Sequence, residues 1–532
     1  MKKDKIFKLT QLICIAAVIT TSCTKKLDLV PTNGTNSGNL FTSAAAYKQV
    51  LAKVYGSFAT TGSTGPGSGD IQGIDAGTSD FLRLYWKAEE LPTDEAVIQW
   101  GDIGIQDFHN MNWTPNNPFL TGLYYRSLYQ ITLANDFIRQ SSDSKVSGNS
   151  ITGPGADSVK TYRAEARFLR AFQYAVMMDI FATPPFVDET ELALGAYPKQ
   201  KTRAELFTYI ESELKAIEPL LPAPKANEYG RADKAAVWAL LARIYLNAKV
   251  YTGTEKYTEA ITYSKKVIDA GYSLIADYRQ LMLADNQQNT SEFILTINYD
   301  GNHTQNYGGT TFLTHAPLGG SIKASDYGVD NTWSGLRTTK ALVAKFPASG
   351  SADARAQFYT DGQSLEITSQ TVYTDGYAIV KYKNKTRAGA NGSNLTFVDI
   401  DFPLFRLSEM YLIYAEAVLR NGTGGDNVTA LSYINKIRTR AYTGTTGNWF
   451  AADLTLDNIL DERARELYWE GFRRTDLIRY GRFTNSTYLW PWKGGVAGGV
   501  AVSDVRNLYP LPSADLRLTP HWYKTQAINF KK

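Results

Sequence analysis

Cysteine is almost absent from this sequence: 532 residues contain two, Cys14 and Cys23. Cys14 lies in an N-terminal segment that we expect to be removed, so the mature chain can form no internal disulfide bond. We also expect no thiol nucleophile and no cysteine-based metal site. An exported protein of this length can fold without a disulfide because its core is large enough.

Histidine is scarce as well, and the four residues show no metal-ligand spacing. They are His109, His303, His315 and His521. Neither a nucleophile elbow nor a phosphate-binding loop occurs in the sequence. A glycosidase needs two carboxylates at a fixed separation, and no motif singles out such a pair among the many acids. We therefore expect a protein that is not an enzyme. A helical-barrel glycoside hydrolase is the enzyme alternative, and an adaptor for a protein partner is the other alternative.

The chain has no marked excess of either charge. Its formal charge is +4. Without the four lysines and one aspartate of the first 22 residues, 52 basic and 51 acidic residues remain. Such a balance gives no electrostatic footprint for nucleic acid. Beyond residue 22 no segment is apolar enough to cross a membrane, so membrane contact is expected through a lipid anchor only.

The N-terminus has the pattern of a secretion signal. Four lysines precede an apolar run from Leu12 to Ile19, which is too short to span a bilayer. A small residue, Ser22, stands directly before Cys23, as in a bacterial lipoprotein cleavage box, although Thr20 occupies a position where leucine is usual. We predict a signal peptide over 1–22, lipidation of Cys23 and a polar linker over 23–39. Secretion without lipidation is the alternative.

Residues 231–271 predict a helical hairpin. Ala232, Ala235, Ala239 and Ala242 recur at helical spacing in its first half, which lets a neighbouring helix approach closely. The second half repeats apolar residues at i, i+3, i+4 and i+7, as in tetratricopeptide helices. One hairpin cannot bury its own apolar face, so we expect further helices stacked on it.

The remaining pattern predicts a mainly α fold. The periodic segments predicted as helices are 44–58, 122–140, 162–181, 204–221, 404–420, 428–440 and 456–469. No helical or strand period persists over 84–118. Between about 280 and 394 the chain is rich in loops, with a predicted strand at 292–299 and a predicted hairpin at 367–382 around Asp375-Gly376. We interpret 40–532 as one domain: a tetratricopeptide-like scaffold over about 40–280 and 395–532, and a loop-rich, partly β insertion over about 280–394.

Several stretches resemble the SusD/RagB family of Bacteroidetes outer-membrane lipoproteins. They are YRAEARFLRAFQYAVMMDIF at 162–181, PLFRLSEMYLIYAEAVLRNG at 403–422, ERARELYWEGFRRTDLIRYGRF at 462–483 and LYPLPSADLRLTP at 508–520. The resemblance implies a mostly helical fold with four tetratricopeptide-like units. It also implies an outer-membrane, surface-exposed location, capture of oligosaccharides and a partner in a SusC-like TonB-dependent transporter.

Shorter segments are similar to the starch-binding member of that family: ELPTDE at 90–95, GRADKAAVW at 230–238, NYGGT at 306–310 and YLWPWKGG at 488–495. This similarity implies that Trp100, Tyr307 and Trp333 form an aromatic arc around a helical α-glucan. Arg83 matches an arginine that hydrogen-bonds sugar hydroxyls. A family asparagine is replaced by Ile103, which leaves Asp102 as the nearest polar candidate. This departure weakens the case for starch and not the case for a carbohydrate. Starch or a malto-oligosaccharide is the expected ligand, and a different glycan is the alternative.

The chemistry of these residues agrees with a sugar ligand. The C–H face of a pyranose packs on an aromatic ring, and its hydroxyl rim binds planar donors and acceptors such as Arg, Asp and Asn. Core packing is the alternative for any single ring. We expect the two tail tryptophans, Trp490 and Trp492, to pack the scaffold or to meet the partner. Asp285, Asp399 and Asp401 are weak candidates for a calcium site, and no other cofactor is expected.

Overall fold

The structure is a computed structural model that describes residues 40–72, 74–190, 198–347 and 352–518. It is 49% helix and 6% strand, so the predicted mainly α class is confirmed. No helix among the described residues combines the length and the apolar character needed to cross a membrane. The predicted signal peptide, the linker and Cys23 lie outside the described residues.

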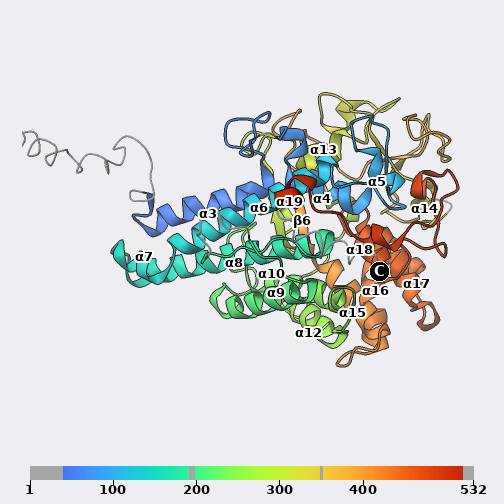
Figure 1. Cartoon of the computed structure of the whole chain (residues 1–532). Coiled ribbons are helices and arrows are strands. Elements are labelled where there is room, and N and C mark those ends of the chain that lie inside the picture. The colour runs from blue at the N-terminus through green and yellow to red at the C-terminus, as the bar shows by residue number, and fades with distance from the viewer. Residues whose placement is uncertain (1–39, 73, 191–197, 348–351, 519–532) are drawn as a thin grey trace, which may run out of the picture.

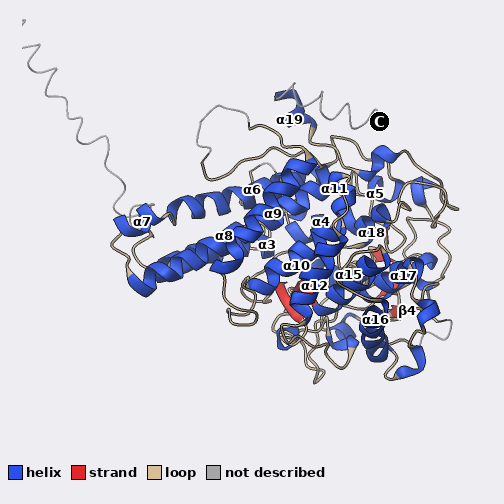
Figure 2. Ribbon diagram, turned by 90° about the horizontal axis from the view of Figure 1, so that it is seen from below, coloured by secondary structure: helices blue, strands red, loops and turns tan. Residues whose placement is uncertain are grey.

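Three long helices form the N-terminal part of the scaffold and lie side by side in both ribbon views (Figures 1 and 2). They are α3 (Ala44–Ala59), α6 (Pro118–Gln140) and α8 (Gly153–Phe181), with the short α7 (Asp143–Gly148) between the last two. The side chains of Ser43 and Asn117 cap α3 and α6 by accepting hydrogen bonds from first-turn N–H groups. The expected helices at 44–58, 122–140 and 162–181 are thus confirmed, with longer N-terminal ends for the last two.

The predicted hairpin forms the next layer, and helices from the C-terminal part of the chain continue the stack. Helix α8 packs against α9, α10 against α12, α12 against α15, and α15 against α16. Tertiary contact therefore joins the helices before the insertion directly to those after it. These elements are α9 (Arg203–Ile217), α10 (Lys234–Leu246), α11 (Ala248–Thr252), α12 (Tyr257–Ile268), α15 (Leu407–Leu419), α16 (Asn427–Ala441), α17 (Leu456–Leu467), α18 (Arg473–Arg479) and α19 (Ser513–Leu518).

Loops with short strands and helices make up the insertion, and many of these loops lie in the upper part of the molecule in Figure 1, around α13. Three antiparallel pairs are present among the described residues: β1 with β3, β2 with β6, and β4 with β5. The insertion contains β2 (Phe293–Ile297), α13 (Gly309–His315), β3 (Leu336–Arg337), α14 (Lys340–Val343), β4 (Phe358–Tyr359) and β5 (Ala378–Ile379). The partner strands β1 (Val97–Ile98) and β6 (Phe402–Arg406) lie before and after it in the sequence.

The predicted hairpin at 367–382 does not form. The carboxylate of Asp375 accepts hydrogen bonds from the backbone N–H groups of Thr368 and Ser369, which folds this segment into turns. Residues 378–379 pair instead with 358–359. The helix predicted from 404 begins at Leu407, because the fully buried residues of β6 pair with β2 first.

Helix α4 (Phe81–Glu90) was not predicted, and neither was the short α5 (Gln106–Asn110). Helix α4 is buried on nearly all sides, including its charged residues Lys87, Glu89 and Glu90. The helix has an apolar stripe but is only ten residues long, and its acids and lysine are of residue types that are almost never fully buried unless paired, so the sequence does not reveal that it lies in the core.

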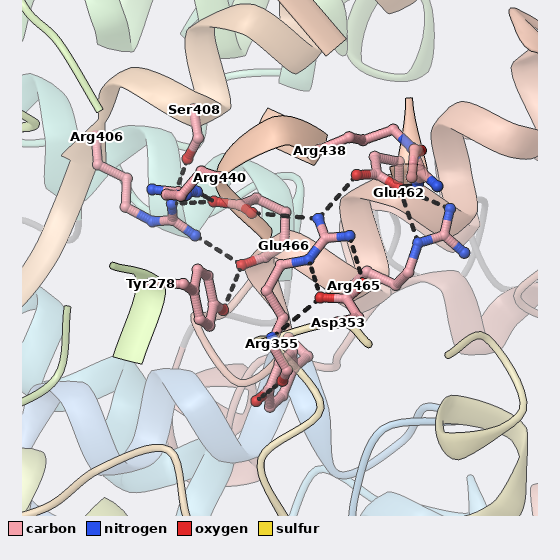
Figure 3. A network of polar contacts seen from close by, with 12 residues as sticks. Tyr278, Asp353, Arg355, Arg406, Ser408, Arg438, Arg440, Glu462, Arg465 and Glu466 are labelled. Carbon is pink, nitrogen blue, oxygen red and sulfur yellow. Dashed lines mark hydrogen bonds and ion pairs between the residues drawn. The ribbon is translucent and has the colours of Figure 1, made fainter. Parts of the chain in front are cut away.

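A buried polar network fastens the insertion and the helices to one another (Figure 3). Glu466 on α17 accepts hydrogen bonds from Arg406 on β6, from Arg440 on α16 and from Arg355 in the insertion. On the same helix, Glu462 accepts from Arg355 at 2.8 Å. Each guanidinium makes further hydrogen bonds, which is the condition under which a buried ion pair is not a net cost.

A second group of buried ion pairs joins α4 to α18. Arg473 contacts both carboxylate oxygens of Asp94, at 2.6 and 2.7 Å, and Arg474 contacts Glu89 at 3.1 Å. The backbone N–H of Gly471 donates to Glu90 at 2.6 Å. The end of α4 and the turn that follows it are therefore held by residues about 380 positions further along the chain.

Enlarging the alanine line of α10 should destabilise the scaffold. Ala239 is fully buried on the helix that packs against α12. Ala239→Leu should overpack this contact and lower the free energy of unfolding by about 1–3 kcal/mol, measured by denaturant titration. Ala204→Leu, at an exposed position of α9, is the matched control. Equal stability of the two variants would show that the contact has room for a leucine.

Glu466→Gln should remove a carboxylate that balances three guanidinium groups. Burial alone would raise the pKa of Glu466, but Arg440, Arg406 and Arg355 outweigh it and lower the pKa to about 2. This carboxylate therefore stabilises the fold above the unfolded-state pKa of about 4.3, and the contribution is lost as pH falls towards 2. At pH 7 the variant should lose about 3–5 kcal/mol.

The stability difference between the Glu466→Gln variant and the parent should shrink as the pH is lowered from 5 to 2, as followed by thermal unfolding. Glu366→Gln is the control, because Glu366 pairs with Lys340 at the surface and this pair is screened by solvent. A difference that stays constant over this pH range would contradict the assignment of a depressed pKa to Glu466.

Candidate functional site

Three aromatic rings from distant parts of the chain lie next to one another. Trp100 follows β1, Tyr307 precedes α13, and Trp333 precedes β3. The centroids of Trp100 and Trp333 are 6.4 Å apart with an interplanar angle of 44°. Those of Tyr307 and Trp333 are also 6.4 Å apart, at 47°. The rings thus form a row with Trp333 in the middle, in which each neighbouring pair is tilted by a similar angle. We call this row the aromatic arc.

The pairing of β1 with β3 brings the two tryptophans together. Val97 lies opposite Arg337 and Ile98 opposite Leu336, and the backbone N–H of Gln99 donates to the carbonyl of Gly335 at 2.9 Å. Gly335 is required at this point, because a Cβ there would lie 2.4 Å from the Trp100 ring. The register of this two-residue ladder therefore sets the relative position of Trp100 and Trp333, which are 233 residues apart in the sequence.

Hydrogen bonds fix the indole groups and leave ring surface accessible. Trp100 Nε1 donates to the carbonyl of Trp333 at 3.1 Å, and Trp333 Nε1 donates to Asn331 Oδ1 at 2.8 Å. The side chains of Trp100 and Trp333 are partly exposed, and Tyr307 is 45% exposed. Rings held in this way keep one orientation, which is the preorganisation that a binding surface requires.

Buried aromatic residues support the arc from behind. His315 stacks on Trp333 with centroids 4.8 Å apart, and Phe397 lies 5.3 Å from Tyr307. Burial lowers the pKa of His315, and the backbone carbonyls of Asn331 and Thr396, which contact its two ring nitrogens at 3.0 Å, oppose that shift. The sequence does not identify His315 and Phe397 as supports of the arc, because a buried ring in a loop has no local pattern that distinguishes it from other core residues.

Arg83, near the start of α4, lies at the edge of the arc. Its Nη1 donates to the carbonyl of Tyr307 at 3.1 Å, and its Cζ lies 5.7 Å from the centroid of Trp100 and 4.8 Å from that of Phe312. Burial lowers the pKa of Arg83, and the charges of Asp80 and Asp102 oppose the shift. The guanidinium thus lies beside the rings of the arc as a planar donor.

Asp80 connects α4 to the loop that carries Tyr307. Its Oδ1 accepts from the backbone N–H of Arg83 at 2.7 Å and from that of Gly309 at 2.9 Å. One carboxylate therefore caps α4 and fixes the start of α13. This connection, which positions Arg83 against Tyr307, was not predicted from the sequence.

Asp102 and Ile103 stand on an exposed turn next to Trp100. The turn is closed by a hydrogen bond from the N–H of Ile105 to the carbonyl of Asp102 at 3.0 Å, and Gly104 adopts φ of +84°. Asn117 Nδ2 fixes the turn by donating to the carbonyl of Gly104. Asp102 is exposed and close enough to Arg83 to affect its pKa, and Ile103 is 87% exposed. The structure thus brings four predicted residues together and leaves Asp102 at their margin.

The three candidate calcium ligands do not form a metal site. Among residues 40–518 outside the gaps, no group of three or more His, Cys, Asp or Glu side chains could hold a metal ion. Asp285 accepts from the N–H of Arg387, Asp399 from that of Gly301, and Asp401 from that of Tyr299. These carboxylates organise loops, which explains their pattern in the sequence without a metal.

The tail tryptophans are distinct from the arc. Trp490 is buried and stacks on Phe483 at 6.3 Å, as expected for a residue that packs the scaffold. Trp492 Nε1 donates to the carbonyl of Ile367 at 2.8 Å and so links the tail to the insertion.

Comparison with known proteins gives consistent matches over the chain. Residues 348–526 match the SusD family, and residues 86–246 match a family described as starch-binding and associating with the outer membrane. The starch-binding protein SusD of Bacteroides thetaiotaomicron is 35% identical, and the alignment covers 95% of each chain.

Solved structures share the fold at lower identity. Surface glycan-binding protein A of Bacteroides thetaiotaomicron is 21% identical, with a TM-score of 0.68 over 90% of this chain and 98% of that one. Its complex with laminarihexaose gives a TM-score of 0.66, also at 21% identity, over 89% and 97% of the two chains. Identity of 35% along nearly the whole length, together with the matching fold, shows that the chain belongs to the SusD family.

Proposed function

We propose that this protein captures oligosaccharides on the aromatic arc, with an α-glucan such as starch or a malto-oligosaccharide as the preferred ligand. The observation that carries the proposal is the arc itself: three accessible rings from separate loops, with the Arg83 guanidinium at their edge. Pyranose C–H faces would pack on the rings, and Arg83 and Asp102 would bind hydroxyls at the rim. Because each ring is turned relative to the next, the arc suits a curved glycan better than a flat one.

The relatives support both the class of ligand and a place at the cell surface. One relative along the whole chain is named for starch binding, and the N-terminal match is described as associating with the outer membrane. We infer that the chain is anchored in the outer membrane through Cys23, faces the cell exterior and passes its glycan to a SusC-like TonB-dependent transporter.

Two alternatives remain open to direct test. A different glycan is favoured by Ile103, which presents an apolar side chain at a rim position where a hydrogen-bonding group would suit a hydroxyl. A glycoside hydrolase would need two carboxylates across one bond. The relatives that cover the chain are named as binding proteins, which supports a binder. Assaying reducing ends after incubation with starch separates a hydrolase from a binder.

Loss of a ring should weaken glycan binding without unfolding the protein. Each ring is expected to contribute about 1–2 kcal/mol, so Trp100→Ala or Trp333→Ala should weaken binding of maltoheptaose roughly tenfold or more in calorimetry. Arg83→Ala should also weaken it, through lost hydroxyl contacts. Helical circular dichroism should remain unchanged.

Tyr307 provides a matched pair of variants. Tyr307→Phe keeps the ring and should bind nearly as the parent does, whereas Tyr307→Ala should bind weakly. Alanine variants that bind α-glucans as tightly as the parent would disprove the site. A parent that binds another glycan, but no α-glucan, would retain the family role and exclude starch.

Lipidation should depend on Cys23. Cells grown with labelled palmitate should incorporate label into the parent and not into Cys23→Ser, because the thiol is the acceptor of the lipid. Cys14→Ser is the control and should be labelled normally. Label that persists in Cys23→Ser would rule out this anchor, and protease treatment of intact cells would establish which side of the membrane the domain faces.

A further inference from the structure

A cavity of about 270 Å³ lies between α3 and β2. Helix α3 contributes Lys48, Ala52, Tyr55 and Gly56, which recur at helical spacing and so form one stripe of its surface. Residues 228–231, in the loop before α10, also line the cavity. No residue of the aromatic arc lines it, so this space is separate from the proposed glycan site. We call it the α3 cavity.

The lining of the α3 cavity is mainly apolar, and hydroxyl groups around it are already used within the protein. Tyr55 donates its hydroxyl hydrogen to Glu165 at 2.7 Å, and Tyr229 donates to Asp401 at 2.8 Å. A sugar needs hydrogen-bonding partners for its hydroxyl groups when it leaves water. The cavity therefore suits an apolar occupant better than a glycan.

Gly56 indicates an occupant that the described residues do not supply. Glycine inside a helix is unfavourable relative to alanine, because it loses more conformational freedom on folding. A Cβ at Gly56 would meet no atom within 4 Å, so nothing in the described structure requires glycine at this position. Glycine is also used where a ligand or another segment approaches the backbone closely. Because Gly56 lines the α3 cavity, we expect such an approach here.

The linker that directly precedes α3 contains a suitable apolar segment. Residues 24–39 read TKKLDLVPTNGTNSGN, and their aliphatic side chains are confined to LDLVP at 27–31. In an extended chain Leu27 and Leu29 lie on one face and Asp28 lies on the other. The rest of the linker is polar, so this short segment is the part that would gain most from burial.

We propose that residues 27–31 fold back along α3 and occupy the α3 cavity, with an apolar side chain against Gly56. The twelve residues from 32 to 43 span up to about 40 Å, whereas the distance along α3 from Ala44 to Gly56 is about 18 Å. Two glycines of the linker, at 34 and 38, favour a turn between the segment and the helix. Because segment and cavity belong to one chain, their effective concentration is high.

Docking of the linker sets the distance between the domain and the membrane. The docking itself does not depend on the proposed function, whereas this consequence rests on the proposed anchor at Cys23. A flexible chain of the 16 residues 24–39 has a root-mean-square length of about 22 Å, and residues 24–26 alone have about 10 Å. A docked linker therefore holds the domain close to the bilayer and restricts its tilt.

Disulfide trapping in the full-length protein tests the contact. Ala52 is exposed and lines the cavity, whereas Gln49, exposed three residues earlier on α3, does not line it and is the matched control. Each is changed to cysteine together with Leu27→Cys, Leu29→Cys or Val30→Cys, and free thiols are counted by maleimide labelling after mild oxidation. At least one of the three pairs with Ala52→Cys should cross-link roughly fivefold more than its counterpart with Gln49→Cys, because a disulfide needs close Cα positions.

Filling the cavity should release the linker. Gly56→Leu places a side chain in the open space of the cavity. Gly148→Leu is the control, because a Cβ at Gly148, the last residue of α7, also meets no atom within 4 Å and does not line the cavity. Thermolysin cleavage within residues 27–31 follows the population of undocked linker. Gly56→Leu should therefore be cleaved there roughly fivefold faster than Gly148→Leu, while both retain the helical circular dichroism of the parent.

The remaining outcomes would overturn the docking. Equal cross-linking of positions 49 and 52 with all three linker residues would do so, as would equal cleavage of the two glycine variants. Cross-links that join two chains, seen as dimers in denaturing gels, would assign the cavity to a second copy. Weaker binding of maltoheptaose by Gly56→Leu, with unchanged cleavage, would assign it to a glycan. Failure of the proposed function is recognised separately, because neither assay of the linker requires a glycan.

Discussion

The fold depends on buried pairs of guanidinium and carboxylate groups more than on any single apolar contact. Glu466 lies at the centre, in contact with arginines from a strand, a helix and the insertion. Removing such charges from water costs several kcal/mol for each ion, and the cost is recovered only where every charge meets partners in good geometry. The arrangement is therefore specific: the sheet strand, α16 and the insertion must all be present before Glu466 is satisfied.

The same kind of interaction positions the proposed binding face. Helix α4 carries Arg83 near its first residue and Glu89 and Glu90 at its last. Arg474 and the backbone of Gly471 hold the acidic end, while Asp80 holds the other end against α13. A rigid helix fixed at both ends transmits the geometry of the scaffold to the guanidinium beside the rings. Loops that lie on such a base can present side chains precisely enough for recognition.

Much of this arrangement could be predicted from the sequence, and the misses have physical causes. The helical hairpin and the stacked helices follow from apolar periodicity, which depends only on the chain itself. The aromatic arc came from resemblance, since no local pattern relates Trp100 to Trp333, and the structure then placed the predicted rings together. Helix α4 escaped prediction because it is short and because it buries Glu89 and Glu90, whose partners lie about 380 residues away.

Errors in the insertion have a similar origin. Asp375-Gly376 is a good hairpin turn in isolation, but the Asp375 carboxylate is used to cap the backbone at Thr368 and Ser369. Asp285, Asp399 and Asp401 resemble cation ligands for the same reason: side chains that organise loops and side chains that bind calcium are of the same type. Only the positions of the backbone N–H groups distinguish the two roles. The domain boundaries at about 280 and 394 stay a prediction.

The short ladder between β1 and β3 makes the proposed binding face a property of the completed chain. Trp100 and Trp333 meet across 233 residues of intervening sequence, and α4 is held only after Arg473 and Arg474 have been synthesised. Contacts between such distant positions close large loops, so they form late and together. A product truncated after residue 400 would contain all three rings of the arc and none of the α18 arginines that hold α4. Retention on an immobilised ligand would therefore serve as a test of chain integrity, selecting full-length, correctly folded molecules from a mixture of export intermediates.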